Sequence, residues 1–202
     1  MRLRTLSLIL AVSAFPLVGC RSMPATHYYM LAPPAANPAE ASTTGLDLGI
    51  EPFRVDPPYD TDEVVYRMGP DALEVGFYAY HRWSAPLGHL VASALADGLR
   101  GTEGLARVEP ASALREYDAV LRGRVICLEE LDRSSGQEAR IEVEVEWVVD
   151  GEVRWHHRVK GQVTGQAEEV AEILVMMQGA FSQVVAELRE SLPVGSRDSS
   201  GD

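Results

Sequence analysis

The chain has 202 residues, 46% hydrophobic and 24% charged, which is enough to bury one core of ordinary size. Its formal net charge of -12 argues against nucleic acid as a partner, because phosphate binding requires a basic face. The same acidity argues against attachment to anionic lipid through a polybasic patch. Two cysteines, Cys20 and Cys127, exclude a scaffold of several disulfides and a zinc site of several cysteines.

The N-terminal residues have the organisation of an export signal. Two arginines within the first four residues precede an apolar stretch, residues 6–18, that is too short for an ordinary membrane span. The stretch runs into Leu-Val-Gly-Cys at residues 17–20, which resembles the lipobox of bacterial lipoproteins. We therefore predict a lipoprotein signal peptide at residues 1–19 and a covalent lipid on Cys20. The alternative is an ordinary secretory signal with an incidental cysteine.

A lipid on Cys20 predicts where the protein resides. Several acyl chains, at ~0.8 kcal/mol per buried methylene, hold a protein at a membrane almost permanently. In bacterial lipoproteins Asp after the cysteine favours the inner membrane, and this chain has Arg21, so we expect an outer-membrane anchor facing the periplasm. Residues 20–26 form the expected lipidated tether, of which residues 21–26 span about 20 Å at most. No cofactor other than this lipid is expected.

Residues 27–193 are predicted to form a single α/β periplasmic domain. A stretch rich in Ala, Pro, Ser and Thr, residues 32–45, predicts a loop or linker near its start. Aromatic residues, or alternation of apolar and polar residues, predict strands over residues 27–31, 46–55, 63–68 and 73–80.

Two segments have the apolar spacing of amphipathic helices. In residues 85–100 apolar side chains recur at intervals of three and four; Ser84 can cap this helix, and two glycines beyond it can end it. Beyond these glycines, Val108 is expected to lead into a loop. A second apolar stripe covers residues 168–192 and stops before a proline, and the polar tail 194–202 is expected to be disordered.

Residues 118–131 are predicted to form a long strand. Its odd-numbered positions are mostly apolar, and Arg122 and Arg124 lie on the other face. Cys127 is on the apolar face, so we expect an inert buried thiol rather than a nucleophile.

Residues 138–164 are predicted to form a β-hairpin around Asp150-Gly151. Apolar residues occupy odd positions on both strands, so the numbers of facing residues must have an even sum. A two-residue turn would place Val149 opposite Glu152 and break that rule, so we expect a loop with an odd number of residues. The same register places the glutamates of the first strand opposite the basic residues of the second.

The order of strands and helices predicts an α+β fold. We expect a largely antiparallel, mixed sheet with two amphipathic helices packed on one face.

The motifs of common catalytic and metal sites do not occur in the sequence. There is no phosphate-binding Gly-x-x-x-x-Gly-Lys loop, no Gly-x-Ser-x-Gly elbow and no His-Glu-x-x-His. His156 and His157 are adjacent in a strand and point to opposite faces, so no metal site is expected. Acidic pairs such as Glu129-Glu130 are expected to be solvated. We therefore expect no catalytic residues.

Four tyrosines, Tyr59, Tyr66, Tyr78 and Tyr80, are the candidate partner-binding residues. Tyr78 and Tyr80 share one face of a predicted strand, and an exposed aromatic row of this kind is typical of protein interfaces. The alternative, which stays equally open, is that a helix covers this face.

Four segments carry recognisable motifs. They are Tyr28, Tyr29 and Leu31 in a Tyr-Tyr-x-Leu strand, Pro57-Pro58-Tyr59-Asp60 in a turn, Val64-Val65-Tyr66-Arg67 in a Val-x-Arg strand, and Arg82-Trp83-Ser84-Ala85-Pro86-Leu87 at the entry to the first helix. Together these segments resemble the ABC-type transport auxiliary lipoprotein family, which includes PqiC-like, MCE-associated lipoproteins. Asp60 and Ser84 depart from the Leu of the family's Pro-x-Tyr-Leu turn and from its usual Ala.

This resemblance implies a non-enzymatic role beside an MCE-domain protein and an ABC permease complex that move lipids between membranes. The lipoprotein would dock or stabilise that complex at the outer membrane, and a homo-oligomer is compatible with this role. The family signature residues with expected structural roles are Arg67, Arg82, Trp83, Pro86 and Leu87. We expect Trp83 to be buried and Arg82 to be hydrogen-bonded at the junction of strand and helix.

Two other functions stay open. One is a lipoprotein activator of a cell-wall synthase or another envelope-assembly factor, which a long disordered tether would favour. The other is a small-molecule binder or hydrolase, which would need a deep polar pocket with a residue of shifted pKa.

Overall fold

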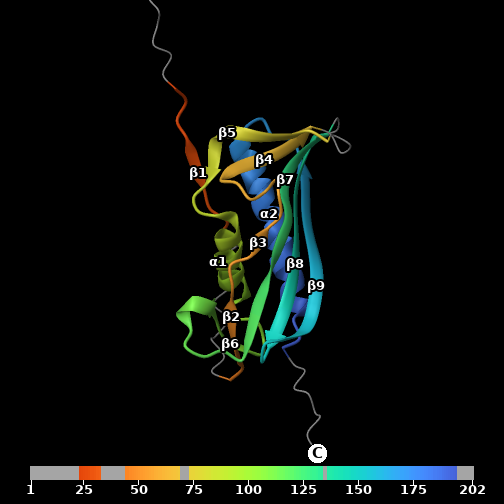
Figure 1. The fold of residues 1–202 in the computed structure, drawn as a ribbon. Helices are drawn as coiled ribbons and strands as arrows, with labels where there is room; N and C mark the ends of the chain where they lie inside the picture. Colours follow the sequence, from red (N-terminus) through yellow and green to blue (C-terminus); the bar gives the residue numbers. More distant parts are fainter. Residues whose placement is uncertain (1–22, 33–43, 69–72, 134–135, 195–202) are drawn as a thin grey trace, which may run out of the picture.

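A computed structural model describes residues 23–32, 44–68, 73–133 and 136–194, and the fold is drawn in Figure 1. The predicted signal peptide, Cys20 and nearly all of the predicted tail lie outside the described residues. The elements are β1 (His27–Tyr29), β2 (Leu46–Ile50), β3 (Arg54–Val55), β4 (Glu63–Met68), β5 (Val75–Trp83), α1 (Leu87–Leu99), β6 (Leu105–Pro110), a short 3-10 helix (Ala111–Ala113), β7 (Ala119–Arg133), β8 (Gly136–Val149), β9 (Glu152–Gly165) and α2 (Val170–Ser191).

The long strand β7 is the centre of a mixed sheet. On one edge it pairs antiparallel with β8, which pairs antiparallel with β9. Along its other edge three short strands, β2, β3 and β4, pair with it in parallel, one after another. β6 extends the sheet beyond β2, and β5 and then β1 extend it beyond β4. The longest pairings are antiparallel and the short ones mostly parallel, which confirms the predicted mixed α+β fold.

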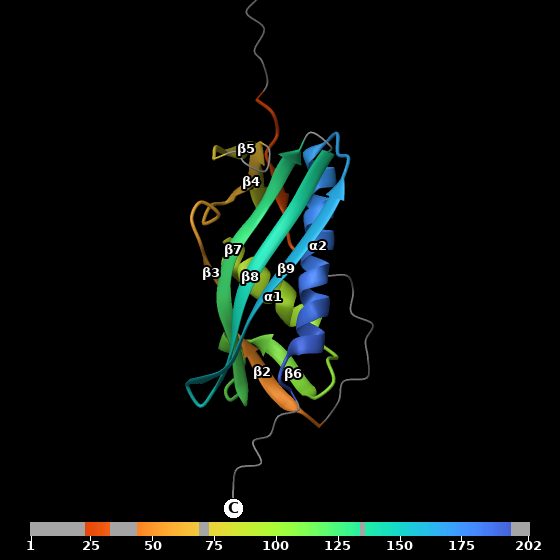
Figure 2. The same cartoon turned by 90° about the vertical axis from the view of Figure 1, so that its right-hand side faces the viewer.

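Both helices lie on one face of the β7–β9 sheet, as Figure 2 shows. α2 packs along β8 and β9, and α1 lies beside β2 and β6. By length and composition α2 could cross a membrane, but the apolar side chains on one side of the helix are buried in this fold. The buried side chains of α2 are Ile173, Met177, Ala180, Phe181, Val184, Val185 and Leu188. In the fold, therefore, α2 is a core helix.

The predicted odd-length loop between β8 and β9 is wrong. Asp150 and Gly151 form a two-residue turn, both with positive φ (53° and 79°), the conformation that matches the twist of a tight hairpin. Val149 therefore faces Glu152, and the numbers of this pair have an odd sum, against the expectation. The register shifts two residues further on, since Val148 faces Val153 but Trp147 faces Trp155. This β-bulge restores the even sum, so the apolar rows still coincide along the rest of the hairpin.

Two local features around α1 differ from the expectation. Val108, expected only to lead into a loop, lies within strand β6. Its buried Leu105 and Val108 are three residues apart because a register shift against β2 interrupts the alternation. Ser84 does not cap α1: Pro86 occupies the N-cap position, and no side chain caps the helix.

Gly161 allows α2 to approach the sheet closely, and we expect Gly161→Ala to destabilise the protein. A Cβ at this position would lie 1.9 Å from the backbone oxygen of Ala180 in α2, so the helix would have to move. Overpacking of this kind costs about 1–3 kcal/mol, measurable by urea unfolding. Gly165→Ala in the same strand is the control, because its Cβ would meet only the flexible Met176 side chain, at 3.2 Å. Equal losses in the two variants would contradict this interpretation.

Candidate functional site

A second bulge, at Ile126 in β7, decides which side chains reach the two faces of the sheet. Val125 pairs with Val143, but Cys127 pairs with Glu142, so Ile126 has no partner of its own. Beyond the bulge, the odd-numbered residues of β7 change to the face turned away from the helices. We call this the outer face; it carries Glu142, Glu144 and Glu146 of β8, and after the bulge also Cys127, Glu129 and Leu131 of β7.

Glu129 is fully buried on this outer face and holds together three other side chains, an arrangement we call the Glu129 cluster. The hydroxyl of Tyr59 donates to Glu129 Oε2 over 2.7 Å. Arg67 donates from Nε to Oε2 (2.8 Å) and from Nη2 to Oε1 (2.9 Å), and Arg140 also donates to Oε1. Tyr59 lies in the connection between β3 and β4, so this cluster fixes that connection to the sheet.

The expectation that Glu129 and Glu130 are solvated is therefore wrong. Burial alone would raise the pKa of Glu129, but the hydrogen bonds from Arg67, Tyr59 and Arg140 outweigh it and lower the pKa. Glu130 has no such cation, and burial raises its pKa. The nearby thiol of Cys127 is buried, which raises its pKa to about 11. A buried thiol of raised pKa is unreactive, which agrees with the expectation for Cys127, although the bulge places this side chain on the outer face.

The four candidate tyrosines do not form one surface. Tyr59 is buried against Glu129, and Tyr78 donates to Glu130 Oε2 over 2.5 Å. The ring of Tyr66 lies 4.7 Å from that of Tyr78, and both are half-buried. Tyr80 is 40% exposed. A register shift between Glu63 and Val64 leaves residues 79–81 of β5 without partners in β4.

The junction between β5 and α1 contains the remaining signature residues. Trp83 is 4% exposed, and its backbone N–H donates to the carbonyl of Asp62 over 2.6 Å. Arg82 donates from Nη1 to Asp62 Oδ2 over 2.7 Å. Pro86 precedes α1, and the side chain of Leu87, its first residue, is buried. These contacts tie β4, β5 and α1 together, which is a structural role.

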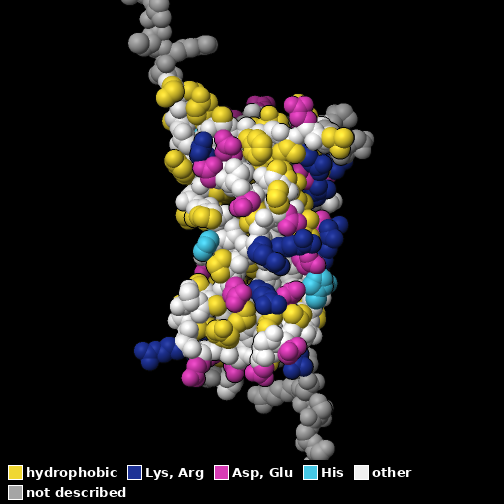
Figure 3. Space-filling model, in the orientation of Figure 1, with side chains coloured by type: hydrophobic (Ala, Val, Ile, Leu, Met, Phe, Trp, Pro, Cys, Tyr) yellow, Lys and Arg dark blue, Asp and Glu magenta, His cyan; other side chains and the backbone are white. Residues whose placement is uncertain are grey.

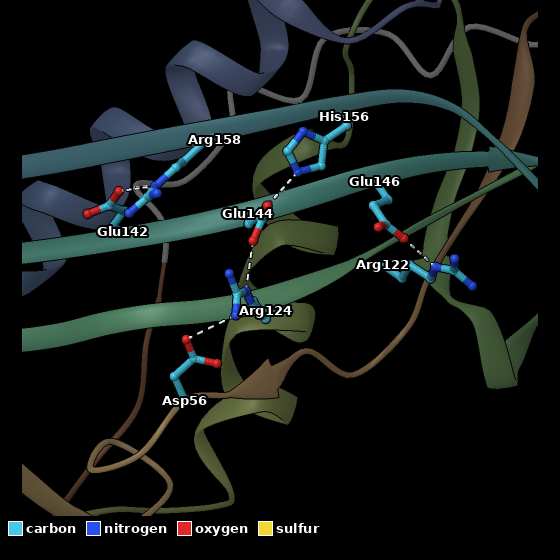
Figure 4. Close-up of polar contacts among 8 residues, drawn as sticks. All are labelled: Asp56, Arg122, Arg124, Glu142, Glu144, Glu146, His156 and Arg158. Carbon is cyan, nitrogen blue, oxygen red and sulfur yellow. Dashed lines mark hydrogen bonds and ion pairs between the residues drawn. The ribbon is translucent and has the colours of Figure 1, made fainter.

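A network of ion pairs covers the middle of the outer face (Figure 4). Arg124 lies 2.7 Å from Glu144 and 3.4 Å from Asp56, and His156 contacts Glu144 on its other side at 2.6 Å. The predicted register is confirmed here, since Glu142, Glu144 and Glu146 pair with Lys160, Arg158 and His156. Two further ion pairs join Arg122 to Glu146 (2.8 Å) and Arg158 to Glu142.

The same face is hollowed beside Arg124. In Figure 3 arginine and acidic side chains alternate over this part of the surface. A hollow of about 410 Å³ lies there and is open to solvent. It is lined by Arg54, Val55, Asp56, Gly123, Arg124, Glu144 and Glu146. The sequence pattern placed Arg122 and Arg124 on one face of the strand, but it did not indicate Asp56, which directly follows β3 and adds a carboxylate to the hollow.

The arrangement of these side chains suits binding better than chemistry. The carboxylate of Glu129 is enclosed by its partners, and the carboxylates around the hollow are paired with arginines. Among the described residues no group of three or more His, Cys, Asp or Glu side chains could hold a metal ion. The fold and the site thus define a small α+β domain with a rigid buried ion cluster and a charged, hollowed sheet face.

Comparison with known proteins identifies the family of this domain. The profile of the family described as the ABC-type transport auxiliary lipoprotein component matches residues 29–189, and the chain belongs to this family. No curated protein matches the chain significantly. Membership makes it a lipoprotein component auxiliary to ABC-type transport, from a family that is not known for catalysis, and indicates a membrane-anchored location in the cell envelope.

Solved structures with TM-scores above 0.5 share the fold. An uncharacterised protein superposes with a TM-score of 0.66 at 16% identity and covers 83% of this chain and 98% of its own. A protein from Xanthomonas campestris superposes with a TM-score of 0.66 at 18% identity and covers 81% of this chain and 92% of its own. PelC from Paraburkholderia phytofirmans, solved as a dodecamer, has a TM-score of 0.43 at 20% identity, with coverages of 80% and 95%.

Proposed function

We propose that the protein is a non-catalytic docking component of an MCE/ABC-type intermembrane lipid transport system, anchored in the outer membrane by a lipid on Cys20 and facing the periplasm. The observation that carries this proposal is the family match over residues 29–189. The lipobox-like residues 17–20 and Arg21 after the cysteine support the anchor and its membrane. Assembly into a homo-oligomer is part of the same proposal.

The partner-docking surface that the geometry supports best is the hollow of the outer face. Its side chains carry both charges in a fixed order, because Arg124 is held by Asp56 and Glu144, and Glu146 is held by Arg122 beside the hollow. Charges arranged in this way favour a partner whose surface carries the complementary pattern of charges. They contribute more to the specificity of binding than to its affinity. The tyrosines suit this role less, since Tyr59 and Tyr78 are engaged inside the domain.

We expect Arg124→Gln to reduce recovery of the transport partner roughly tenfold, because it removes the charge shared by Glu144 and Asp56. The measurement is purification of the full-length lipoprotein from native membranes, with identification of the proteins and lipids that accompany it. Arg107→Gln is the matched control: Arg107 forms a comparable surface ion pair with Asp47, but on β6 and β2. Both variants should unfold within about 1 kcal/mol of the native protein, since exposed ion pairs contribute little.

An MCE-domain protein or ABC permease in the native eluate would support the proposal. A penicillin-binding protein in its place would favour the cell-wall alternative. Equal recovery with Arg124→Gln and Arg107→Gln would move the docking surface away from the hollow.

A further inference from the structure

Exposed apolar side chains are concentrated at one end of the domain. Ten large hydrophobic side chains are exposed in the described part of the chain, and seven of them belong to β1, its flanks or the β4–β5 hairpin. In Figure 3 hydrophobic side chains gather over this end, from which the N-terminal segment leaves. We call it the apolar end and define it by Met23, Tyr28, Met68, Leu73, Phe77 and Tyr80, which are between 40% and 97% exposed.

The length of the tether determines which end of the domain meets the membrane. Six residues separate Cys20 from His27, the first residue of β1, and the seven backbone steps between them allow about 25 Å at full extension. β7 has 15 residues and is therefore about 50 Å long. β4 pairs with its C-terminal end, whereas the β8–β9 turn lies near its N-terminal end. A lipid on Cys20 thus keeps the apolar end close to the bilayer and the turn with Val153 away from it.

The side chains of the apolar end suit the boundary between the headgroups and the hydrocarbon core of a bilayer. Methionine, leucine and phenylalanine side chains bury apolar area there, and tyrosines favour the boundary between headgroups and acyl chains. The sequence has one lysine, Lys160 in β9, so no lysine lies at this end. In the described part of the chain its arginines are already paired, Arg67 with Glu129, Arg82 with Asp62 and Arg133 with Glu138. Binding by these residues is therefore not expected to depend on attraction to anionic headgroups.

We propose that the apolar end is a membrane-contact surface, which inserts Leu73, Phe77 and their neighbours into the phospholipid bilayer that carries the anchor. This proposal rests on the membrane anchoring in the proposed function. It gives the tethered domain a fixed orientation, with β5 against the lipid and the long axis of β7 pointing away from it. The hollow of the outer face then lies beyond the headgroups, where a soluble partner can reach it.

The orientation is measured with an environment-sensitive fluorophore at one end or the other. The mature chain from residue 20 carries Cys20→Ser and an N-terminal hexahistidine tag, and nickel-chelating phosphatidylcholine vesicles hold it in place of the lipid. The fluorophore NBD is attached at Glu74→Cys, which leaves the apolar side chains intact, or at Val153→Cys. Cys127 does not compete for the label, because it is buried.

We expect the NBD emission to shift to the blue, and nitroxide lipids to quench it, at residue 74 and not at residue 153. Adding Leu73→Ser and Phe77→Ser should abolish the shift at residue 74, whereas Val175→Ser, on the exposed side of α2, should leave it unchanged. A third of anionic lipid should not increase the signal. The proposal is overturned if residue 74 stays in water on the vesicles, if both positions respond alike, or if the response requires anionic lipid. The tag replaces the acyl anchor and no transport partner is present, so failure of the proposed function would not change this result.

Discussion

Replacing Glu129 with alanine is expected to lower the free energy of unfolding by about 3–5 kcal/mol. The substitution removes the carboxylate that Arg67 and Arg140 share. Both guanidinium groups then lack their partner at a site where the Glu129 side chain is fully shielded from water. Removal of one partner from a buried ion pair costs this much because the remaining charge is desolvated and unpaired. Both arginines keep some contact with solvent, 21% and 31% of their side chains, so a value near the lower limit is expected.

Urea unfolding of the purified domain measures this loss, and two variants calibrate it. Tyr59→Phe removes one hydrogen bond to Glu129 and should cost about 1 kcal/mol. Arg122→Gln removes an exposed ion pair from the same face and should cost less than about 1 kcal/mol. A loss of less than 1 kcal/mol in Glu129→Ala would show that the cluster does not hold the β3–β4 connection.

The stability that Glu129 contributes should depend on pH in a defined direction. Its pKa is lowered from the ordinary value of 4.5, so its contribution is present above that value and is lost as the pH falls through the lowered pKa. The pKa of Glu130 is raised, so its contribution has the opposite sign: it is present below 4.5 and is lost as the pH rises through the raised pKa. The difference between native protein and Glu129→Ala should therefore shrink in acid. A difference that does not change between neutral pH and pH 2 would contradict the lowered pKa.

The Glu129 cluster also explains why two of the sequence motifs occur together. The Pro-x-Tyr turn supplies Tyr59 and the Val-x-Arg strand supplies Arg67, and both side chains bind one carboxylate. The sequence could suggest that these residues are structural, but it could not identify their partner. Strict alternation along β7 puts Glu129 with the apolar residues on the helix side, and only the bulge at Ile126 moves it to the outer face.

Elsewhere, the sequence predicted structure well where regular alternation or helical spacing was unbroken. Both helices and the long strands lie within a few residues of the predicted ranges. The errors fall where one residue interrupts a pattern. Asp150 adopts a positive φ that permits a tight turn, and the bulge beside Trp147 then brings the apolar residues of both strands back to the same face. The register shift between Leu46 and Asp47 interrupts the alternation in β6, so the pattern around Val108 did not indicate a strand. Such irregularities depend on the neighbouring strand, so the period of one segment cannot show them.

Phe181→Ala is expected to cost about 3–5 kcal/mol, and it tests whether α2 is a core helix in solution. Phe181 is completely buried in the layer between α2 and the sheet, where truncation leaves a cavity that the close-packed helix cannot fill. The helix cannot move inwards, because at Gly161 a Cβ would already lie 1.9 Å from the carbonyl oxygen of Ala180. The helix therefore cannot move towards the sheet to fill the cavity that the substitution leaves.

The alternative for a helix of this length and hydropathy is a membrane span, and the two roles predict different results. A core helix makes the soluble domain lose stability with Phe181→Ala and not with Val175→Ala, since Val175 is 72% exposed on the same helix. A span would place both side chains in lipid and make the two variants alike. Urea unfolding of the mature chain with Cys20→Ser, without detergent or lipid, distinguishes them. A difference of at least 2 kcal/mol between the variants is expected from the cavity term alone. That result would agree with the proposal that a lipid on Cys20 and the apolar end, rather than α2, meet the membrane.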